Sequence, residues 1–545
     1  VTTTQFAGED LGELGLLKMD ILGLRTLSVV QKALQLIEAR SGAEAANALA
    51  LERIPLDDAN TFTMLVSRAV GVFQLDSTGM RDLLRKLRPT EIEDIIALIS
   101  LYRPGPMKAG MVDEFVRRKH GREKVAYDHP LLEPILKTTF GTMVYQEQIM
   151  KIAMAVGGFT PGQADTLRKA MGKKRPEEME KPRASFLEGA RTRGVNAKTA
   201  NRIFDNMVKF GGYGFNRSHA AAYGLLAYHT AYLKANFPVE YMTGLLSTVM
   251  DKTERMVTYL TETRDMGIPL LPPDVQRSRV EFAIEDASAG HGTAPGTFGI
   301  RFGLLAVKNV GQSAIESLIA AREAGGAFKS LEDFCARVDT RLLNKRVVES
   351  LIKAGAMDAF GKRAALTARV DEALAFGQAR QAERLAGQGA LFGLDPDAPH
   401  PALSPPGRGN QAPVREWPEH RILAEEKEVL GFYLSGHPLA RWGEEMKVYA
   451  RQTIGQALKL QEGASVRVGG IVTHMKKIKT KAGDLMAAIR LADLEGEIEV
   501  VVFPKTFAQV SRALQVDRLV IVTGTLDTSR ETTQIRADDV IEFYE

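Results

Sequence analysis

The chain has 545 residues, of which 45% are hydrophobic and 25% are charged, the composition of a globular protein with several domains. Its net charge of +4 excludes a globally basic nucleic-acid binder, so any such surface must be local. A single cysteine, Cys335, excludes an internal disulfide framework and a cysteine-based zinc site, and it favours the cytoplasm. We expect no membrane segment, because no run of about 18 apolar residues occurs. The chain begins with Val1 rather than methionine, and we expect it to be part of a longer protein.

The segment 15–24 is apolar except for Lys18 and Asp20. If it forms a strand, these two side chains share one face, and Met19 faces the core, because residues i and i+2 point the same way. Such a pair suits a metal–phosphate site, in which Asp20 holds Mg²⁺ and Lys18 meets a phosphate oxygen. A half-buried strand with a surface ion pair explains the same pattern.

The next segments predict helices joined by short turns. Residues 25–53 have helical spacing that Gly42 closes, and Asp57 is a candidate N-cap of the helix that follows. Residues 71–77 predict an extended run leading into a helix capped by Ser77. Arg103 precedes a proline and is therefore held extended. It is either a surface loop residue or a cation set beside an anionic ligand, and we assign it to DNA binding.

A basic stretch follows within a strongly helical region, 140–250. Residues 168–193 carry nine basic and four acidic side chains, an excess larger than that of the whole chain. It begins with Arg168, Lys169, Lys173 and Lys174. Two interpretations remain open: a solvated helix end, where cations are favoured, or a site for a triphosphate or nucleic-acid backbone.

The segment 210–223 interleaves glycines with aromatic residues, which lets its backbone approach a ligand closely. Asn216 or Ser218 could cap the helix that follows. Asn216, Arg217 and His219 at a helix N-terminus predict an anion site, although a structural histidine fits equally well.

The region 270–300 is rich in Pro, Gly and Ser and predicts a domain boundary. After it, Lys308, Asn309, Val310 and Gly311 form a turn between helical segments, typical of a helix-hairpin-helix whose backbone N–H groups bind a DNA phosphate. Asn309 stands where glycine is usual, and asparagine tolerates a positive φ. Residues 342–356 predict a second hairpin. An ordinary helical bundle explains both.

Residues 363–386 predict a polar helix, followed by Gln388, Leu391 and Phe392 and by a Pro/Gly-rich stretch, 395–413. One polar and two apolar anchors beside a flexible linker suit insertion into a partner's pocket.

From 464 onward the pattern is that of strands: 466–472, 486–491, 498–503, 519–524 and about 533–542, with a helix at 505–514 between the third and fourth. Five strands with this helix predict an OB barrel. Lys476, Lys477 and Lys479 are expected in the loop after the first strand. The net charge of 461–545 is −2, so we expect weak single-strand binding at most. The predicted fold class is multidomain α+β.

Seven motifs resemble those of the bacterial replicative DNA polymerase III alpha subunits, the C-family DNA polymerases. They are LKMDILGLR (17–25), VFQL (72–75), YRPGP (102–106), YQEQ (145–148), RKAMGKK (168–174), GYGFNRSH (212–219) and LGFYLSGHPL (430–439). The resemblance implies that Asp20 is one of three palm aspartates that bind two Mg²⁺ ions, and that Lys18 contacts the triphosphate. It places 168–174 and 216–219 in the fingers, around the incoming deoxynucleotide and template. Gln388, Leu391 and Phe392 would bind the sliding clamp.

The resemblance also implies a domain order. It is palm end (1–30), fingers (31–295), helix-hairpin-helix region (296–386), clamp motif and linker (387–413), helical connection (414–460) and OB domain (461–545). The other two metal-binding aspartates belong to a Pro-Asp-x-Asp motif, which this chain lacks. The clamp loader and the proofreading subunit would bind regions that the family's proteins have outside the present sequence. We therefore expect DNA polymerase activity of a longer protein and none of this chain alone. The alternative is a non-catalytic module that binds DNA and recruits a clamp.

Overall fold

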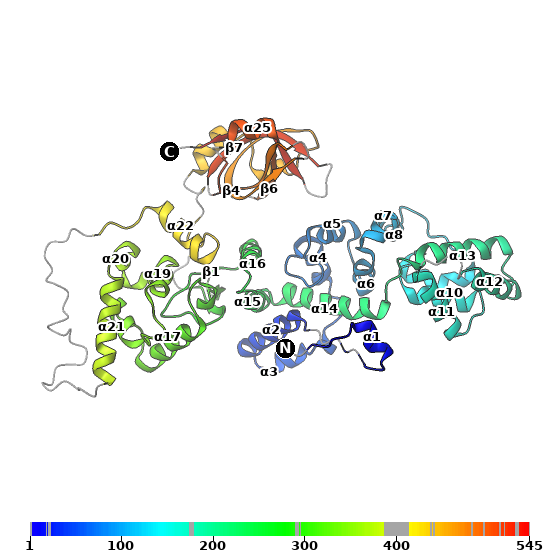
Figure 1. Cartoon of the computed structure of the whole chain (residues 1–545), viewed down its shortest axis with the longest axis horizontal. Helices are drawn as coiled ribbons and strands as arrows, with labels where there is room; N and C mark the ends of the chain where they lie inside the picture. The colour runs from blue at the N-terminus through cyan, green and yellow to red at the C-terminus, as the bar shows by residue number, and fades with distance from the viewer. Residues whose placement is uncertain are drawn as a thin grey trace. The chain divides into compact units, whose positions relative to one another are not determined.

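The computed structural model describes residues 3–17, 19, 23–173, 179–288, 294, 296–385, 414–436, 439, 442–480, 483–493, 496–511, 514–516, 518–528 and 533–543. The chain divides into two compact units. Their helices and strands are labelled in Figure 1. The first comprises Val1–Pro269 with Ile284–Ile300, and the second Leu270–Ala283 with Arg301–Glu545. Within the described residues, no helix is both long and apolar enough to cross a membrane.

The first unit is helical. Its helices are α1 (Gly8–Glu13), α2 (Arg25–Ser41), α3 (Ala43–Ala48), α4 (Ala59–Arg68), α5 (Thr78–Leu87), α6 (Ile92–Leu101), α7 (Pro104–Lys108), α8 (Met111–Lys119), α9 (Glu133–Leu136), α10 (Gln146–Ala155), α11 (Pro161–Lys173), α12 (Glu180–Thr192), α13 (Ala197–Gly211), α14 (Arg217–Asn236), α15 (Pro238–Thr248) and α16 (Thr253–Asp265). Short 3₁₀ turns cover Leu51–Arg53, Pro130–Leu132 and Lys137–Thr139.

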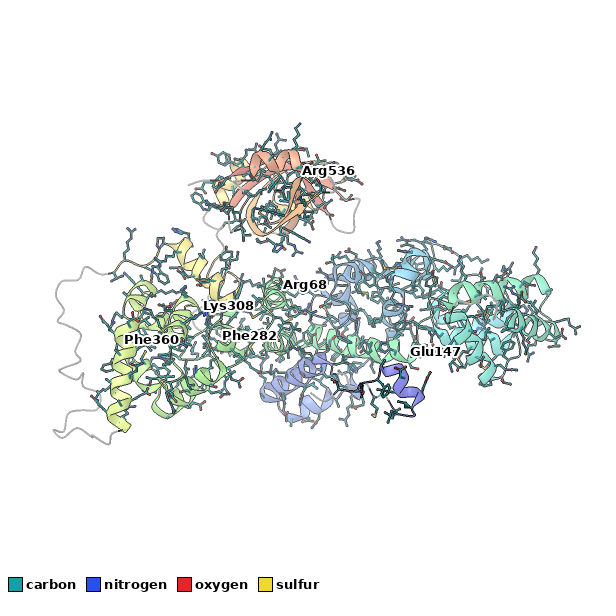
Figure 2. The ribbon with its side chains drawn as sticks, in the orientation of Figure 1. Arg68, Glu147, Phe282, Lys308, Phe360 and Arg536 are labelled. Atoms are coloured by element: carbon teal, nitrogen blue, oxygen red, sulfur yellow. The ribbon has the colours of Figure 1, made fainter. Side chains whose placement is uncertain are left out.

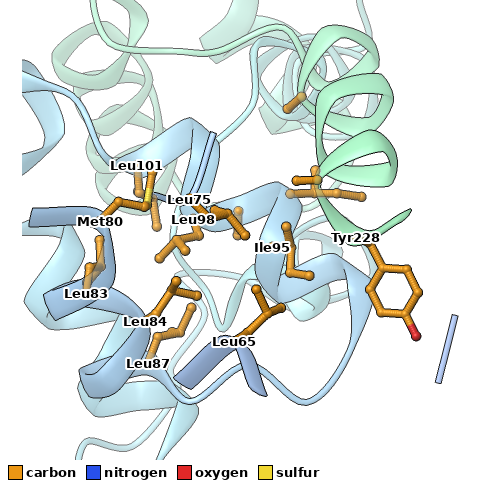
Figure 3. Packing of buried hydrophobic residues seen from close by; sticks show 14 of the residues in the cluster. Leu65, Leu75, Met80, Leu83, Leu84, Leu87, Ile95, Leu98, Leu101 and Tyr228 are labelled. Carbon is orange, nitrogen blue, oxygen red and sulfur yellow. The ribbon is translucent and has the colours of Figure 1, made fainter. Parts of the chain in front are cut away.

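Helix α14 contributes to one hydrophobic cluster of this unit but not to a second. One lies among α4, α5, α6 and α14 and includes Leu65, Leu84 and Ile95, all buried (Figure 3). The other lies among α10–α13. Tyr228 of α14 packs against Phe62, with ring centroids 5.4 Å apart, and its hydroxyl donates to the carbonyl of Pro55 at 2.8 Å. The long helix is thus anchored by aromatic packing and by a satisfied buried hydroxyl.

Local capping explains where these helices begin, and it corrects three predictions. Asp58, not Asp57, caps α4 by accepting from the N–H of Thr61 at 2.8 Å. Gly42 ends α2 at φ +87°, so the helix predicted over 25–53 is two helices and a 3₁₀ turn. Residues 71–77 are a run of turns rather than an extended segment, and Gln74 has φ +61°. Ser77 caps α5, as predicted.

The strand predicted at 15–24 is not seen among the residues that are described there. Leu16, Leu17 and Met19 are 59%, 84% and 75% exposed, so the prediction that Met19 faces the core is wrong. A strand needs a neighbour for its backbone N–H and C=O groups, and the described residues pair none with this segment. Lys18 and Asp20 lie outside the described residues.

The second unit combines helices with a barrel. Its helices are α17 (Gln312–Gly325), α18 (Leu331–Arg337), α19 (Lys345–Lys353), α20 (Arg363–Ala368), α21 (Val370–Leu385), α22 (Glu419–Leu430), α23 (Gly443–Tyr449), α24 (Ile454–Ala457) and α25 (Pro504–Val510), with 3₁₀ turns at Leu304–Ala306 and Asp358–Phe360. The short strands β1 (Leu270–Leu271), β2 (Ala283–Asp286) and β3 (Phe298–Arg301) lie where the chain passes between units. The helix predicted over 363–386 is two helices, because α20 ends at Ala368.

The C-terminal strands close into a barrel. They are β4 (Ser465–Lys479), β5 (Leu485–Ala492), β6 (Glu497–Val502), β7 (Leu519–Asp527) and β8 (Gln534–Glu542), in the order β4-β5-β6-β8-β7. Most pairs are antiparallel, and the parallel pairing of β6 with β8 completes the ring. Helix α25 lies between β6 and β7, as predicted, and Phe507 on it packs into the barrel core. The predicted α+β class with an OB-type barrel is confirmed.

Candidate functional site

Four sequence motifs that are far apart in the chain meet at the N-terminal end of α14. Tyr145 and Phe215 form a parallel β-bridge, in which the N–H of Gln146 donates to the carbonyl of Phe215 at 2.9 Å. The side chain of Gln146 donates to the carbonyl of Gly214 at 3.1 Å. We call this meeting point the junction, and Glu147, labelled in Figure 2, lies within it.

Arg103 is extended, as predicted, with φ −147°. Its guanidinium donates to the carbonyls of Ser100 at 2.8 Å and Tyr213 at 2.7 Å, and it lies 4.5 Å from the ring centroid of Phe215. Burial lowers the pKa of this guanidinium from its ordinary value. Arg103 therefore stabilises the glycine–aromatic loop through its contacts with Tyr213 and Phe215.

The N-terminus of α14 is already occupied by a carboxylate of the protein itself. The N–H of Arg217 donates to both carboxylate oxygens of Glu147, at 3.0 and 3.1 Å. Asn216, rather than Ser218, is the cap and accepts from the N–H of His219 at 2.8 Å. Two of the first three helix amides are thus satisfied, so any anion site here must be formed mainly by side chains.

Two of the predicted phosphate-binding cations are paired with one acid. Asp165 accepts from Arg168 at 2.8 Å and from Lys169 at 2.8 Å. Hydrogen bonds from Lys169 and then from Arg168 hold the pKa of this carboxyl below its ordinary value. Arg168 also donates to the side chain of Gln146 at 3.1 Å, which connects it to the junction. Both lie inside α11, which continues to Lys173; the side chain of Lys173 and all of Lys174 lie outside the described residues.

Aromatic rings follow one face of α14 beside the junction. The His219 ring lies 4.3 Å from Tyr223 and 5.6 Å from Phe215, and Phe73 lies 5.4 Å from Tyr223. His219 is exposed and Tyr223 is half-buried. Arg217, also exposed, donates to Glu93 at 2.7 Å. A cation beside exposed ring faces is an arrangement on which a nucleobase can stack while its phosphate is neutralised.

Tyr145 adds a polar atom that the sequence did not single out. Its side chain is 1% exposed, and within the described part of the chain its hydroxyl has no hydrogen-bond partner. Burial raises the pKa of this hydroxyl far above its ordinary value, so it stays protonated. A buried donor without an acceptor costs free energy.

The predicted hairpin turn is present in the second unit. Asn309 has φ +68°, as its place in the turn requires, and its amide donates to the hydroxyl of Ser350 at 3.1 Å. The N–H and ammonium of Lys308 donate to the carbonyls of Val429 and Glu428 at 2.9 and 3.0 Å, so the turn is fixed to α22 (Figure 2).

A cavity with three cations and two acids in its lining adjoins the same turn at Asn309. Val310 is buried and Gly311 is the N-cap of α17, so backbone rather than side chains is offered there. The adjoining cavity, of about 460 Å³, is lined by Asn309, Lys345, Arg346 and Lys353 among others. Lys353 is paired with Glu425 at 2.6 Å and Lys345 with Asp371 at 2.7 Å. Of the described cations in this lining, Arg346 is therefore the one left to meet a phosphate.

The barrel lysines are placed differently from the prediction. Lys476, Lys477 and Lys479 lie within β4, paired with β5, and not in a loop, because β4 continues to Lys479. All three are exposed. Sequence reasoning also missed Phe503, which is 41% exposed with Arg536 5.5 Å from its ring centroid. Its position just before Pro504, at the end of a strand, is the only signal of its exposure.

The described residues do not provide the donor set for two Mg²⁺ ions. Among them, no group of three His, Cys, Asp or Glu side chains is arranged to hold a metal ion. Asp20, the predicted ligand, lies outside the described residues, as do the predicted clamp-binding residues Gln388, Leu391 and Phe392.

Comparison with known proteins agrees with this architecture. Residues 26–194 match the model of the bacterial DNA polymerase III alpha subunit finger domain, 267–366 a helix-hairpin-helix motif, and 460–543 an OB-fold nucleic acid binding domain. The chain is 42% identical to the DNA polymerase III subunit alpha of Vibrio cholerae and of Escherichia coli K12, over 96% of its own length and 44% of theirs. It is 43% identical to that of Thermus aquaticus over 97% of its length and 42% of the relative's. The chain spans less than half the length of these curated relatives. Over the part that it spans, it belongs to the family of bacterial DNA polymerase III alpha subunits.

Proposed function

We propose that this chain forms the fingers, hairpin and OB parts of a DNA-directed DNA polymerase that adds deoxynucleotides to a primer 3′-hydroxyl during chromosomal replication in the cytoplasm. The observation that carries the proposal is the junction, where four motifs of the family meet around a basic, aromatic end of α14. It is supported by relatives named as DNA polymerase III alpha subunits.

Each predicted site residue has a role in this proposal. Arg168, Lys169, Lys173 and Lys174, with Arg217, neutralise the triphosphate, and the His219 and Tyr223 rings meet the base. Arg103 and Asn216 keep that surface in shape. The turn at 308–311 and the lysines of β4 bind the DNA backbone. Lys18 meets the triphosphate, and Asp20 contributes one of the ligands to Mg²⁺, which supplies charge neutralisation when bound.

The proposed partners follow from the same reading. Primer–template DNA and deoxynucleoside triphosphates are the substrates, and Gln388, Leu391 and Phe392 attach the chain to a sliding clamp. The clamp loader and the proofreading subunit bind regions of the longer protein. Because two further metal-binding aspartates are expected elsewhere, the chain alone is proposed to be inactive.

Primer extension tests the proposal. A protein extended to the length of the relatives is compared with its Asp20→Asn variant, with Mg²⁺ and all four deoxynucleotides. Loss of extension with unchanged duplex affinity supports Asp20 as a metal ligand. Extension that survives the substitution contradicts that role, and incorporation by the 545-residue chain alone contradicts the proposed division of the site. If the long protein binds DNA and clamp but never extends a primer, the chain is a non-catalytic, clamp-recruiting module.

A further inference from the structure

A strongly basic cavity lies in the first unit, formed by residues that take no part in the junction. It has a volume of about 550 Å³ and opens where the C-terminal ends of α5 and α8 meet. Its charged lining consists of five cations and one carboxylate: Arg85, Lys86, Arg88, Arg117 and Arg122, with Asp113. We call it the basic pocket. His120 ties its two walls together, since the ring Nε2 lies 3.0 Å from the carbonyl of Lys86.

Three of the five cations have no ion-pair partner among the residues that the structure describes. Arg85 is paired with Asp82, and Arg117 with Glu123 at 2.9 Å. Within the described residues, Lys86, Arg88 and Arg122 have no carboxylate within 4.0 Å, and all three are exposed. The pocket therefore concentrates positive charge that the fold itself does not neutralise.

Helix dipoles explain only part of this arrangement. Cations in the last turn of a helix are favoured, which accounts for Arg85, Lys86 and Arg117. It does not account for Arg88 and Arg122, which lie beyond the ends of α5 and α8. Arg88 also has φ +48°, a left-handed position at a helix end where glycine is preferred because a side chain there is strained. The chain keeps an arginine at a position where the backbone favours glycine.

We propose that the basic pocket binds the phosphodiester backbone of single-stranded DNA, independently of the junction. Among the described lining residues, none except the histidine carries a ring on which a base could stack, so recognition must be of phosphates and not of bases. A concave pocket of this size takes in a flexible single strand, whereas duplex DNA is stiff and cannot bend into it. The choice of DNA as the source of the phosphates rests on the proposed function.

Binding of a fluorescent oligo-dT to the 545-residue chain, followed by anisotropy, tests this. The triple variant Lys86→Gln, Arg88→Gln, Arg122→Gln should weaken binding by about tenfold or more at low salt. It should also lower the slope of log K against log salt by about 2, because each lost contact to a single strand removes roughly 0.7. The matched control is Lys151→Gln, Lys198→Gln, Lys209→Gln, three exposed lysines outside the pocket. Equal losses in both triple variants would overturn the proposal.

Arg88→Gly separates binding from folding. Relief of the strained backbone should raise the urea midpoint of unfolding, while loss of the guanidinium should weaken oligo-dT binding several-fold. A raised midpoint with unchanged affinity would show that the side chain meets no DNA.

Two further ligands distinguish the sources of phosphate. The proposal expects the triple variant to leave affinity for a blunt duplex nearly unchanged. If it instead loses affinity for inorganic tripolyphosphate but not for oligo-dT, the pocket takes free phosphate chains and the assignment to DNA is wrong. Failure here is separable from failure of the proposed function, since Asp20→Asn affects primer extension and not oligo-dT affinity.

Discussion

The junction and the basic pocket are both rich in cations, but they differ in whether those cations have partners in the protein. At the junction, Arg103 is bonded to backbone carbonyls, Arg168 to Asp165 and Arg217 to Glu93. In the basic pocket, Lys86 and Arg88 have no such partner among the described residues. The difference teaches that some of the charged residues in a sequence motif stabilise the site and are not free to bind a ligand. Charge that is free for a ligand can instead lie where no motif draws attention.

The largest effect is expected for a cation that only stabilises the fold. Lys234 of α14 is fully buried and donates to the carbonyls of Arg68 and Val70 and to Glu262, the last at 2.6 Å. Lys234→Met should cost about 3–5 kcal/mol in the free energy of unfolding, because it leaves the Glu262 carboxylate buried and unpaired. Urea denaturation measures this.

The control is the double variant Lys234→Met, Glu262→Met, which should recover part of the loss. A single variant within about 1 kcal/mol of the wild type would show that buried pairing does not dominate here.

Arg103 provides the next largest effect. Arg103→Lys should cost about 2 kcal/mol, since lysine cannot reproduce a planar fork that bonds the carbonyls of Ser100 and Tyr213 together. Amide exchange at Phe215 should accelerate. If DNA affinity falls while stability and amide exchange stay unchanged, Arg103 binds DNA rather than stabilising the loop, and its assignment to the fold is wrong.

Glu147→Gln should cost about 1 kcal/mol, because a neutral amide interacts less favourably with the N-terminus of α14 than a carboxylate does. Chemical denaturation of the variant measures the loss. Glu188→Gln is the control, since Glu188 is paired on the surface with Arg191 of its own helix. A loss no larger than that of the control would mean that the carboxylate does not stabilise the helix end.

The smallest effect concerns Asp165. Asp165→Asn should raise affinity for tripolyphosphate severalfold at neutral pH, because Arg168 and Lys169 are released from their acid. The pKa of Asp165 is lowered in the fold, so its stabilising effect is present above the ordinary carboxyl pKa and is lost as the pH falls through the lowered value. Titration calorimetry with tripolyphosphate at neutral pH measures the affinity, and denaturation at neutral and acidic pH measures the stability. Unchanged affinity would mean that Arg168 and Lys169 stay paired with Asp165.

Local patterns were enough to predict much of the fold. Five strand-like segments and the helix between the third and fourth, now α25, identified the barrel. Ser77 and Gly42 marked helix ends correctly. Errors arose where neighbouring residues offer the same chemistry, as Asp57 and Asp58 do. The lysines of β4 were misplaced because that strand continues with polar residues beyond the barrel core.

The site was harder to predict because its contacts are tertiary. Nothing near Glu147 in sequence indicates that its carboxylate meets an amide 70 residues away. The basic pocket likewise combines cations from two segments about 30 residues apart, each of which resembles an ordinary helix end. The motifs identified the segments that form the junction. Only the fold showed which of their charged side chains are paired within the protein.

Helix α14 has a mechanical consequence. Its 20 residues make a rod about 30 Å long, with the junction at one end and the buried Lys234 at the other. The cluster among α4, α5 and α6 includes residues of this rod, and the bridge between Tyr145 and Phe215 lies just before its first residue. Bending the rod would stretch its backbone hydrogen bonds. A force applied at the junction is therefore expected to reach the cluster packed on α14 through the helix, which acts as a stiff lever.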